Sequence, residues 1–430
     1  MSYGLRTHDP ASQALSSQLT VFHLCLDTTV NMKITSLYTL CLSRMHEPER
    51  QWFTSTFRVV KADCAIVVIE TDEGITGIAE ACAYGGPVQI RRWVSHYAPL
   101  LVGRDPLDPG MPPAPHFRSR SHDCAVAGID CALWDIRGKA AGKTVSRLLV
   151  ESGASPRTEP PINPVPLYAS SGCRYDWGDD PHQLIEEALS YIAQGYTAMK
   201  IRLGTDWSWH GVTVDRFLGL MRELVQTVRA TGMPFNLALD GNQRLTEAQA
   251  LPIARELERL GFAWFEEPIP QADVDGYARL AAAVEIPITG GEQFTTVEQF
   301  MPYFERRAYD IVQPDVGWCG LTEGMRIVRM AEHYGVRVIP HNWHNGLMTM
   351  ANAHFVAALP HPMLCELCMI QGPLQWAILK GRPRIESGML YLPDASGLGV
   401  ELADDLEATF PYITGDWALP VHYQDMVVRW

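Results

Sequence analysis

The sequence has no long hydrophobic run and a shortage of basic residues. Its 430 residues include 35 lysines and arginines against 49 aspartates and glutamates, which gives a formal net charge of −14. This balance argues against nucleic acid and anionic membrane surfaces as partners, and no apolar stretch approaches the roughly 18 residues of a membrane span. A small anionic substrate is not excluded, because a bound metal and a few cations can reverse the local field.

Disulfide and targeting signals are also lacking. Ten cysteines are scattered through the chain, unlike the dense frameworks of short secreted domains, so we expect a cytoplasmic protein with reduced thiols. The apolar stretch Leu19–Leu26 contains His23 and follows no basic cluster, which argues against a signal peptide. Residues 1–31 show no periodicity, and we interpret them either as a disordered leader or as the product of a start codon placed too far upstream.

The length predicts two domains, because a barrel needs only about 250 residues and leaves room for a smaller unit. We expect an α+β domain over residues 32–155, a barrel over residues 156–392 that begins with a proline-rich stretch, and a tail over residues 393–430 that packs back on the first domain. Within the first domain, strands are expected at Lys33–Leu42, Cys64–Glu70 and Thr76–Glu80, and a helix at Val126–Ala141.

From residue 165 onward the sequence repeats a short β-branched or aromatic run, a loop and an amphipathic helix. Thr246 with Gln249 predicts a capping box at one helix start, and Thr295 with Glu298 predicts another. Eight strands alternating with helices favour a closed parallel barrel, whereas an open sheet would be supported by a GxGxxG motif that is missing. The expected strands are Val165–Ser170, Ala198–Leu203, Phe235–Asp240, Ala263–Glu266, Ile288–Glu292, Ile311–Asp315, Val336–His341 and Met363–Leu367.

Carboxylates stand at the ends of three successive strands. Asp240, Glu266 and Glu292 are each 26 residues apart, about the length of one strand–helix unit, so they are expected at equal height on the active-site face of the barrel. One such acid would more often cap the following helix, but three in register would repel one another unless a cation joined them. Oxygen ligands of this kind predict Mg²⁺. Strand alternation places Glu267 on the side opposite to Glu266.

The same spacing continues through the last three strands. Asp315 is followed by His341 after 26 residues and by Glu366 after a further 25. A carboxylate on one ring nitrogen raises the basicity of the other, so Asp315 and His341 predict a general base, although a single histidine is more often structural. On the second strand, Lys200 and Arg202 share one side, and buried cations there need carboxylates or an anionic substrate.

These motifs resemble the mandelate racemase branch of the enolase superfamily. The first domain contributes ETDEGITGIAEA at Glu70–Ala81 and AGIDCALWDIRGKAAG at Ala127–Gly142. The resemblance runs from about Met32 to beyond Leu392. In the barrel the matching motifs are KxR at Lys200 and Arg202, DGN at Asp240–Asn242, FEEP at Phe265–Pro268, GGE at Gly290–Glu292, PD at Pro314–Asp315 and PH at Pro340–His341.

The resemblance implies a modified (β/α)₇β barrel with an α+β capping domain, in subunits that form a homo-oligomer and hold one Mg²⁺ each. It implies a metal site of Asp240, Glu266 and Glu292, a base dyad of Asp315 and His341, and Glu366 as a hydrogen-bond donor or acid beside the substrate carboxylate. Further substrate contacts are expected from Asn242, His46, Arg50, Trp52 and Tyr84, and Trp343 and His344 are expected in the pocket wall.

One position departs from the resemblance. Mandelate racemase has a lysine base where this chain has Arg202, and a guanidinium stays protonated at ordinary pH. We therefore interpret Arg202 and Lys200 as holding the substrate carboxylate and His341 as the sole base. This favours dehydration of a sugar acid through an enediolate. The alternatives are a racemase, epimerase or cycloisomerase on the same intermediate, and a barrel that binds acids without turning them over.

Overall fold

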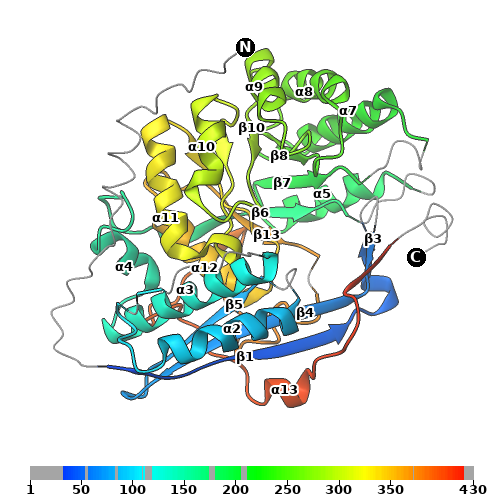
Figure 1. Cartoon of the computed structure of the whole chain (residues 1–430). Helices are drawn as coiled ribbons and strands as arrows, with labels where there is room; N and C mark the ends of the chain where they lie inside the picture. Colours follow the sequence, from blue (N-terminus) through cyan, green and yellow to red (C-terminus); the bar gives the residue numbers. More distant parts are fainter. Residues whose placement is uncertain are drawn as a thin grey trace, which may run out of the picture.

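The computed structural model describes residues 32–53, 57–82, 86–108, 110–111, 119–173, 180–204, 211–370 and 372–420. The predictions for residues 1–31 and for Tyr84 lie outside this range. Figure 1 shows a barrel above and a domain of blue strands and cyan helices below it. In the described residues, none of the helices has both the length and the apolar character needed to cross a lipid bilayer.

The first domain is an antiparallel meander covered by helices. Its strands have the order β1 (Ile34–Met45), β4 (Lys61–Thr71) and β5 (Thr76–Ala81). Helix α3 packs so closely on β5 that a Cβ atom at Gly77 would lie 2.3 Å from the carbonyl oxygen of Ala132, which explains the glycine at this point. The helices are α2 (Pro87–Leu101), α3 (Arg120–Ala140) and α4 (Val145–Glu151).

The second domain is a parallel barrel, as predicted. Seven of its eight strands are each followed by a helix, and the eighth, β13, pairs with the first, β6, which gives the (β/α)₇β arrangement. The strands are β6 (Val165–Ser171), β7 (Ala198–Arg202), β8 (Asn236–Asp240), β9 (Phe265–Glu266), β10 (Ile288–Gly290), β11 (Ile311–Val312), β12 (Arg337–Val338) and β13 (Cys365–Cys368). The helices are α5 (Gln183–Ala193), α7 (Val214–Ala230), α8 (Glu247–Leu260), α9 (Val274–Ala283), α10 (Val297–Glu305), α11 (Val316–Tyr334) and α12 (Gly346–Ala357).

Several strands are shorter than predicted, and this changes the local role of Asp315. Strand β11 ends at Val312, so Asp315 is not a strand end but the N-cap of α11, where its Oδ1 accepts a hydrogen bond of 2.8 Å from the N–H of Gly317. His341 likewise lies in the loop after β12. The prediction that these residues end their strands was wrong, although both still follow the strand expected for them.

The two domains share one hydrophobic core, and polar contacts fix the first domain on α11. Asp130 of α3 accepts hydrogen bonds from the hydroxyl and the N–H of Thr322, at 2.5 and 2.9 Å. Gly320, with φ of 75°, breaks the helical geometry just before this contact, and a Cβ atom there would lie 2.7 Å from Asp130 Oδ2. The first domain therefore holds the helix whose N-terminus carries Asp315.

The tail returns to both domains. A hairpin of β14 (Arg384–Glu386) and β15 (Met389–Tyr391) extends the barrel sheet beside β6. Further on, α13 (Leu406–Thr409) contacts β1, and β16 (Ala418–Pro420) pairs with β3 (Phe57–Val59), which in turn pairs with β2 (Trp52–Phe53). Trp52 of β2 and Phe57 of β3 line a cavity at the barrel mouth, so this three-stranded sheet forms part of the wall of that cavity.

Candidate active site

The strand ends bring carboxylates to the barrel mouth. Asp240 ends β8 and Glu266 ends β9, and the two are direct partners in the parallel ladder. Glu292 follows two residues after β10, whose Thr289 pairs with Glu266. Burial raises the pKa of Asp240, and the negative charge of Glu292 adds to the rise, so these carboxylates lie close enough to repel each other.

Some of these oxygens are buried without a hydrogen bond. In the described part of the chain this holds for Asp240 Oδ2, Glu267 Oε1 and Glu292 Oε2. Cationic atoms stand further off, with Arg202 Nη2 3.6 Å from Asp240 Oδ2 and His341 Nε2 3.4 Å from Glu292 Oε2. Buried carboxylate oxygens that repel one another and lack donors fit a hard divalent cation, which takes oxygen ligands.

Two adjacent glutamates, Glu266 and Glu267, are candidates for the third carboxylate ligand of such a cation. Glu266 is hydrogen-bonded at both oxygens, by Lys200 Nζ at 2.5 Å and by Gln313 Nε2 at 2.6 Å, and Trp264 Nε1 adds a third bond of 3.2 Å. Glu267 accepts one bond from Gln243, of 2.9 Å. Its φ of 35° takes it out of strand geometry, so it lines the same cavity as Glu292 rather than facing away as alternation predicted.

Lys200 is fixed by two buried ion pairs. Its Nζ lies 2.5 Å from Glu266 Oε1 and 2.9 Å from Glu366 Oε1. Burial lowers the pKa of Lys200, but the charges of Glu266 and Glu366 outweigh this and raise it above the usual value. Lys200 is therefore a permanent cation. Arg202 stacks on Trp343, with 4.7 Å between its Cζ and the ring centroid, and both residues line the cavity at the barrel mouth.

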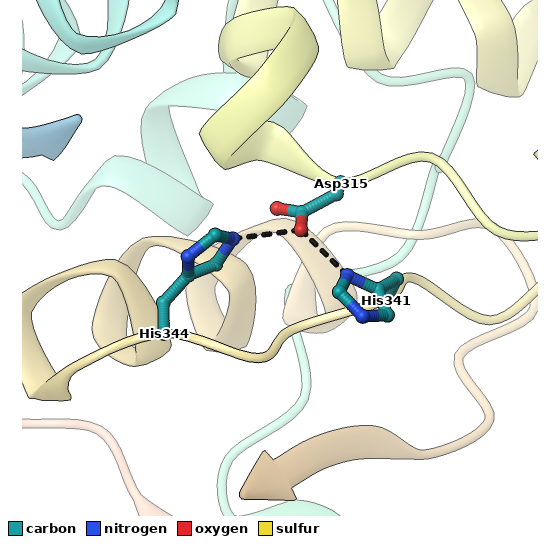
Figure 2. A group of neighbouring side chains, drawn as sticks. All are labelled: Asp315, His341 and His344. Atoms are coloured by element: carbon teal, nitrogen blue, oxygen red, sulfur yellow. Dashed lines mark hydrogen bonds and ion pairs between the residues drawn. The ribbon is translucent and has the colours of Figure 1, made fainter. Parts of the chain in front are cut away.

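Asp315 joins two histidines through a single oxygen (Figure 2). His341 Nδ1 and His344 Nε2 each lie 2.7 Å from Asp315 Oδ2, and all three side chains are buried. Donor atoms this close together could hold a metal ion, but the short nitrogen–oxygen distances are those of hydrogen bonds. We therefore interpret the cluster as a hydrogen-bonded relay that leaves His341 Nε2 directed at Glu292.

The charge of His341 depends on its neighbours. Burial lowers the pKa of His341, yet the charges of Glu292 and Glu366 and the hydrogen bond with Asp315 raise it to about 10. Neutralising Glu292 would remove the largest of these opposing effects and favour the neutral ring, which is the form that can accept a proton. The same bonds hold the pKa of Asp315 below its usual range, since charged His344 and His341 outweigh burial.

Glu366 on β13 faces the same centre. Its Oε2 accepts a hydrogen bond of 2.7 Å from the N–H of Asn342. Burial raises the pKa of Glu366, but Lys200 and His341 outweigh it and lower the value to about 2. Glu366 is thus ionised and accepts hydrogen bonds, so the predicted role as a donor requires that an anionic substrate raise its pKa again.

Two cavities adjoin this centre. The larger, of about 250 Å³, is lined by Glu292, His341, Arg202 and Asn242. The smaller, of about 90 Å³, is lined by His46 and His344, together with Lys61 of β4. The two cavities share Trp52 and Trp343, whose rings lie 5.5 Å apart. Arg50 lines neither cavity and pairs at the surface with Glu47, at 3.7 Å.

Sequence reasoning missed several residues of the site. Gln313 and Trp264, which hold Glu266, lie on or beside barrel strands and carry no motif that marks them. Arg120 reaches the larger cavity from the start of α3. The only available signal for Arg120 was its place before an apolar helical pattern, and this does not indicate where the side chain goes.

Two family models match the chain. One is described as the N-terminal domain of mandelate racemase and muconate lactonizing enzyme and matches residues 36–150. The other is described as enolase C-terminal domain-like and matches residues 183–406. Together they cover both domains of the fold.

Relatives with named activities extend over most of the chain. The arabinonate dehydratase of Saccharolobus solfataricus is 34% identical over 345 residues, which cover 78% of this chain and 87% of that protein. The D-galactarolactone cycloisomerase of Agrobacterium fabrum is 30% identical over 397 residues, which cover 88% and 99%. The crystal structure of the 3,6-anhydro-D-galactonate cycloisomerase from Zobellia galactanivorans has a TM-score of 0.73 at 28% identity and covers 88% of this chain and 100% of that chain.

Proposed function

Because the chain belongs to the mandelate racemase and muconate lactonizing enzyme family of the enolase superfamily, we propose that it is a Mg²⁺-dependent lyase that dehydrates a sugar acid. Enzymes of this superfamily use a divalent metal, and the unpaired oxygens of Asp240 and Glu292 fit one. We assign the metal to Asp240, Glu266 and Glu292, since Glu266 and Asp240 are direct ladder partners. A bound Mg²⁺ supplies positive charge where negative charge develops on the substrate carboxylate.

The dehydratase assignment rests on one observation. This is the arrangement around the cavity of the side chains that can or cannot accept a proton. His341 is held through Nδ1 by Asp315, at 2.7 Å, and can accept a proton at Nε2. Lys200 is a permanent cation between Glu266 and Glu366, and Arg202 stays protonated. Among the described residues lining the larger cavity, His341 is thus the side chain suited to take the α-proton, so one group has to serve both halves of the reaction.

The proposed reaction balances with this one group. His341 Nε2 takes the α-proton of a 2,3-dihydroxy acid, and the C–H electron pair forms a double bond within an enediolate. That pair then forms the Cα–Cβ double bond as the β C–O bond breaks, and Nε2–H returns its proton to the departing hydroxyl, which leaves as water. The enol product becomes a 2-oxo-3-deoxy acid. Arg202 and Lys200 carry the positive charge that orients the substrate carboxylate.

Cycloisomerisation is the second candidate function, because one relative is named for it. It starts with the same α-proton transfer but breaks the Cβ–O bond of a lactone, whose ring carboxylate leaves in place of water. The two are separated by incubating sugar acids and their lactones with the Mg²⁺-loaded enzyme in D₂O and following products by NMR. Loss of water with a 2-oxo-3-deoxy product supports the dehydratase. Deuterium at the α-position without water loss would overturn it in favour of a racemase or epimerase. Conversion of a lactone to a 2-oxo-3-deoxy acid without water loss would overturn it in favour of a cycloisomerase.

We also propose the setting in which the enzyme works. The nine cysteines of the described residues are free and buried, which agrees with a reducing cytoplasm. The domain limits at residues 155 and 392 and a homo-oligomeric state are proposed from the sequence and the family. Light scattering on the purified protein measures the subunit number, and limited proteolysis maps the domain limits.

A further inference from the structure

Three arginines line the larger cavity, and the proposed reaction uses only one of them. Arg202 lies deepest, 3.6 Å from Asp240 and stacked on Trp343. Arg120 and Arg244 line the same cavity with exposed side chains. Hydroxyl groups of a sugar acid can be recognised by neutral partners, so the guanidinium group of Arg120 on the rim calls for a separate explanation.

Arg120 is held in place by neutral groups. Its Cζ lies 4.8 Å from the centroid of the Trp318 ring, and its Nη2 donates a hydrogen bond of 2.9 Å to Gln293 Oε1. Gln293 directly follows Glu292, and both residues line the same cavity as Arg120. Within the described part of the chain, no carboxylate lies within ion-pair distance of Arg120. Among the described residues, the charge of Arg120 is held in position but is not paired with a carboxylate.

The place of Arg120 suits recognition of an anion at the far end of a substrate. It belongs to the first domain, whereas Glu292 and His341 belong to the barrel, so a ligand that contacts all three spans the cavity. The rings of Trp52, Trp318 and Trp343 line the same cavity. An arginine stacked on an aromatic ring presents its planar donors in the geometry that a carboxylate accepts.

We propose that the substrate is a polyhydroxy dicarboxylic acid, whose distal carboxylate is bound by Arg120. This deepens the proposed function and rests on it for the identity of the reacting end. The cavity of about 250 Å³ is close to the lower end of small-molecule sites, which suits a linear acid of this kind. The competing interpretation is that Arg120 only balances the charge of Glu292 and its neighbours.

The test is binding, so that it does not depend on turnover. His341→Asn protein loaded with Mg²⁺ is titrated calorimetrically with aldonic and aldaric acids matched in hydroxyl configuration, in the galacto, gluco and manno series. Each pair differs only in the terminal group, CH₂OH or carboxylate. We expect at least one diacid to bind fivefold or more tightly than its partner, and Arg120→Gln in the same background to remove most of that difference. Arg120→Lys should keep part of it, since the charge remains without the planar stack.

The outcomes are distinct. If no diacid binds at least fivefold better than its partner, the proposal is wrong. If Arg120→Gln weakens both members of a pair equally, or weakens Mg²⁺ binding instead, Arg120 serves the metal site and the proposal also fails. If 6-phosphogluconate binds more tightly than every diacid, the rim of the cavity binds a phosphate group and the dicarboxylate proposal is wrong. Arg255→Gln, exposed on α8 and outside the cavity, is the matched control and should bind as the parent does.

Failure of this proposal is separable from failure of the proposed function. Turnover of any acid by wild-type enzyme in D₂O tests the function. If the wild type dehydrates an aldonic acid and discriminates against the diacid, the proposed function stands and the dicarboxylate proposal is wrong. If the wild type binds diacids through Arg120 but exchanges no α-proton, the dicarboxylate proposal stands and the proposed reaction is wrong.

Discussion

The N–H of Asn342 donates a hydrogen bond of 2.7 Å to Glu366, and its side-chain Nδ2 donates another, of 2.9 Å, to the carbonyl oxygen of Glu366. These bonds join the loop after β12 to β13. The described strands β12 and β13 form no ladder with each other, so Asn342 closes the barrel at this seam. The residue that closes the barrel is thus also the one that orients a carboxylate of the site.

Asn342→Ala should therefore destabilise the protein and disturb the site together. The change removes the bonds from Nδ2 to Glu366 and Thr349 and the bond accepted from Asn352, and it leaves buried partners unpaired, at a cost of about 2–4 kcal/mol. Chemical denaturation measures the loss. The exposed Asn236 of β8 provides the control, since Asn236→Ala should change the free energy of unfolding by less than about 0.5 kcal/mol. Equal effects of the two changes would contradict the closing role.

His341→Asn should reduce α-proton exchange by at least about a hundredfold, since a general base contributes about 10²–10⁴-fold. Asp315→Asn should also lower exchange strongly, because the neutral amide no longer stabilises the charged imidazole ring, while Asn can still cap α11. Exchange is measured by NMR in D₂O. The exposed His361 supplies the control, as His361→Asn should exchange like wild type. If His341→Asn kept exchange within tenfold of wild type, Lys200 or Arg202 would have to be the base.

Spacing in the sequence predicted which residues meet, because one strand–helix unit has nearly constant length. It placed Asp240 and Glu266 at one height, and the structure pairs them in the ladder. The capping box of Thr246 and Gln249 is also confirmed. The other predicted capping box is displaced by one residue, to Thr296 and Gln299, because such a motif fixes a helix start only when a single candidate pair is present.

Loop geometry could not be predicted from periodicity. His344 binds the same oxygen of Asp315 as His341 does because the chain turns between β12 and α12, and this turn leaves no repeating pattern. The orientation of Glu267 followed from a strand that ends one residue earlier than alternation requires. Contacts made by long side chains between domains, such as Arg120 with Gln293, depend on tertiary packing alone.

Metal titration of variants can show which of the two adjacent glutamates, Glu266 or Glu267, is a metal ligand. We expect Glu266→Gln to weaken Mg²⁺ binding at least tenfold, since it removes a charged ligand and the ion pair with Lys200. Glu267→Gln should weaken it less than threefold, because its charge only adds to the local field. Calorimetric titration of the apoprotein after treatment with EDTA measures both. The reverse order would move the third ligand from Glu266 to Glu267, whose Oε1 lacks a hydrogen bond among the described residues.

His354 should make the fold acid-sensitive. This buried residue of α12 lies with Nδ1 3.3 Å from the N–H of Ser146 in α4 and with Nε2 3.2 Å from the carbonyl oxygen of Leu398 in the tail. Nδ1 therefore accepts from the Ser146 N–H and Nε2–H donates, so a second proton, on Nδ1, would break the bond to that N–H. Burial lowers the pKa of His354 from 6.5 to about 4. The unfolded chain takes up a proton near pH 6.5 and the folded protein only near pH 4, so stability should fall by about 3 kcal/mol as the pH drops through this window.

The measurement is urea denaturation at several pH values between 4 and 7.5. His354→Gln should have a flatter pH profile in this window than wild type, because the amide can accept from Ser146 and donate to Leu398 without titrating. His361→Gln, on the exposed His361, should keep the wild-type profile. The prediction is wrong if the free energy of unfolding changes with pH equally in wild type and His354→Gln. The neutral ring of His354 would then not link the first domain, the barrel and the tail as its two hydrogen bonds indicate.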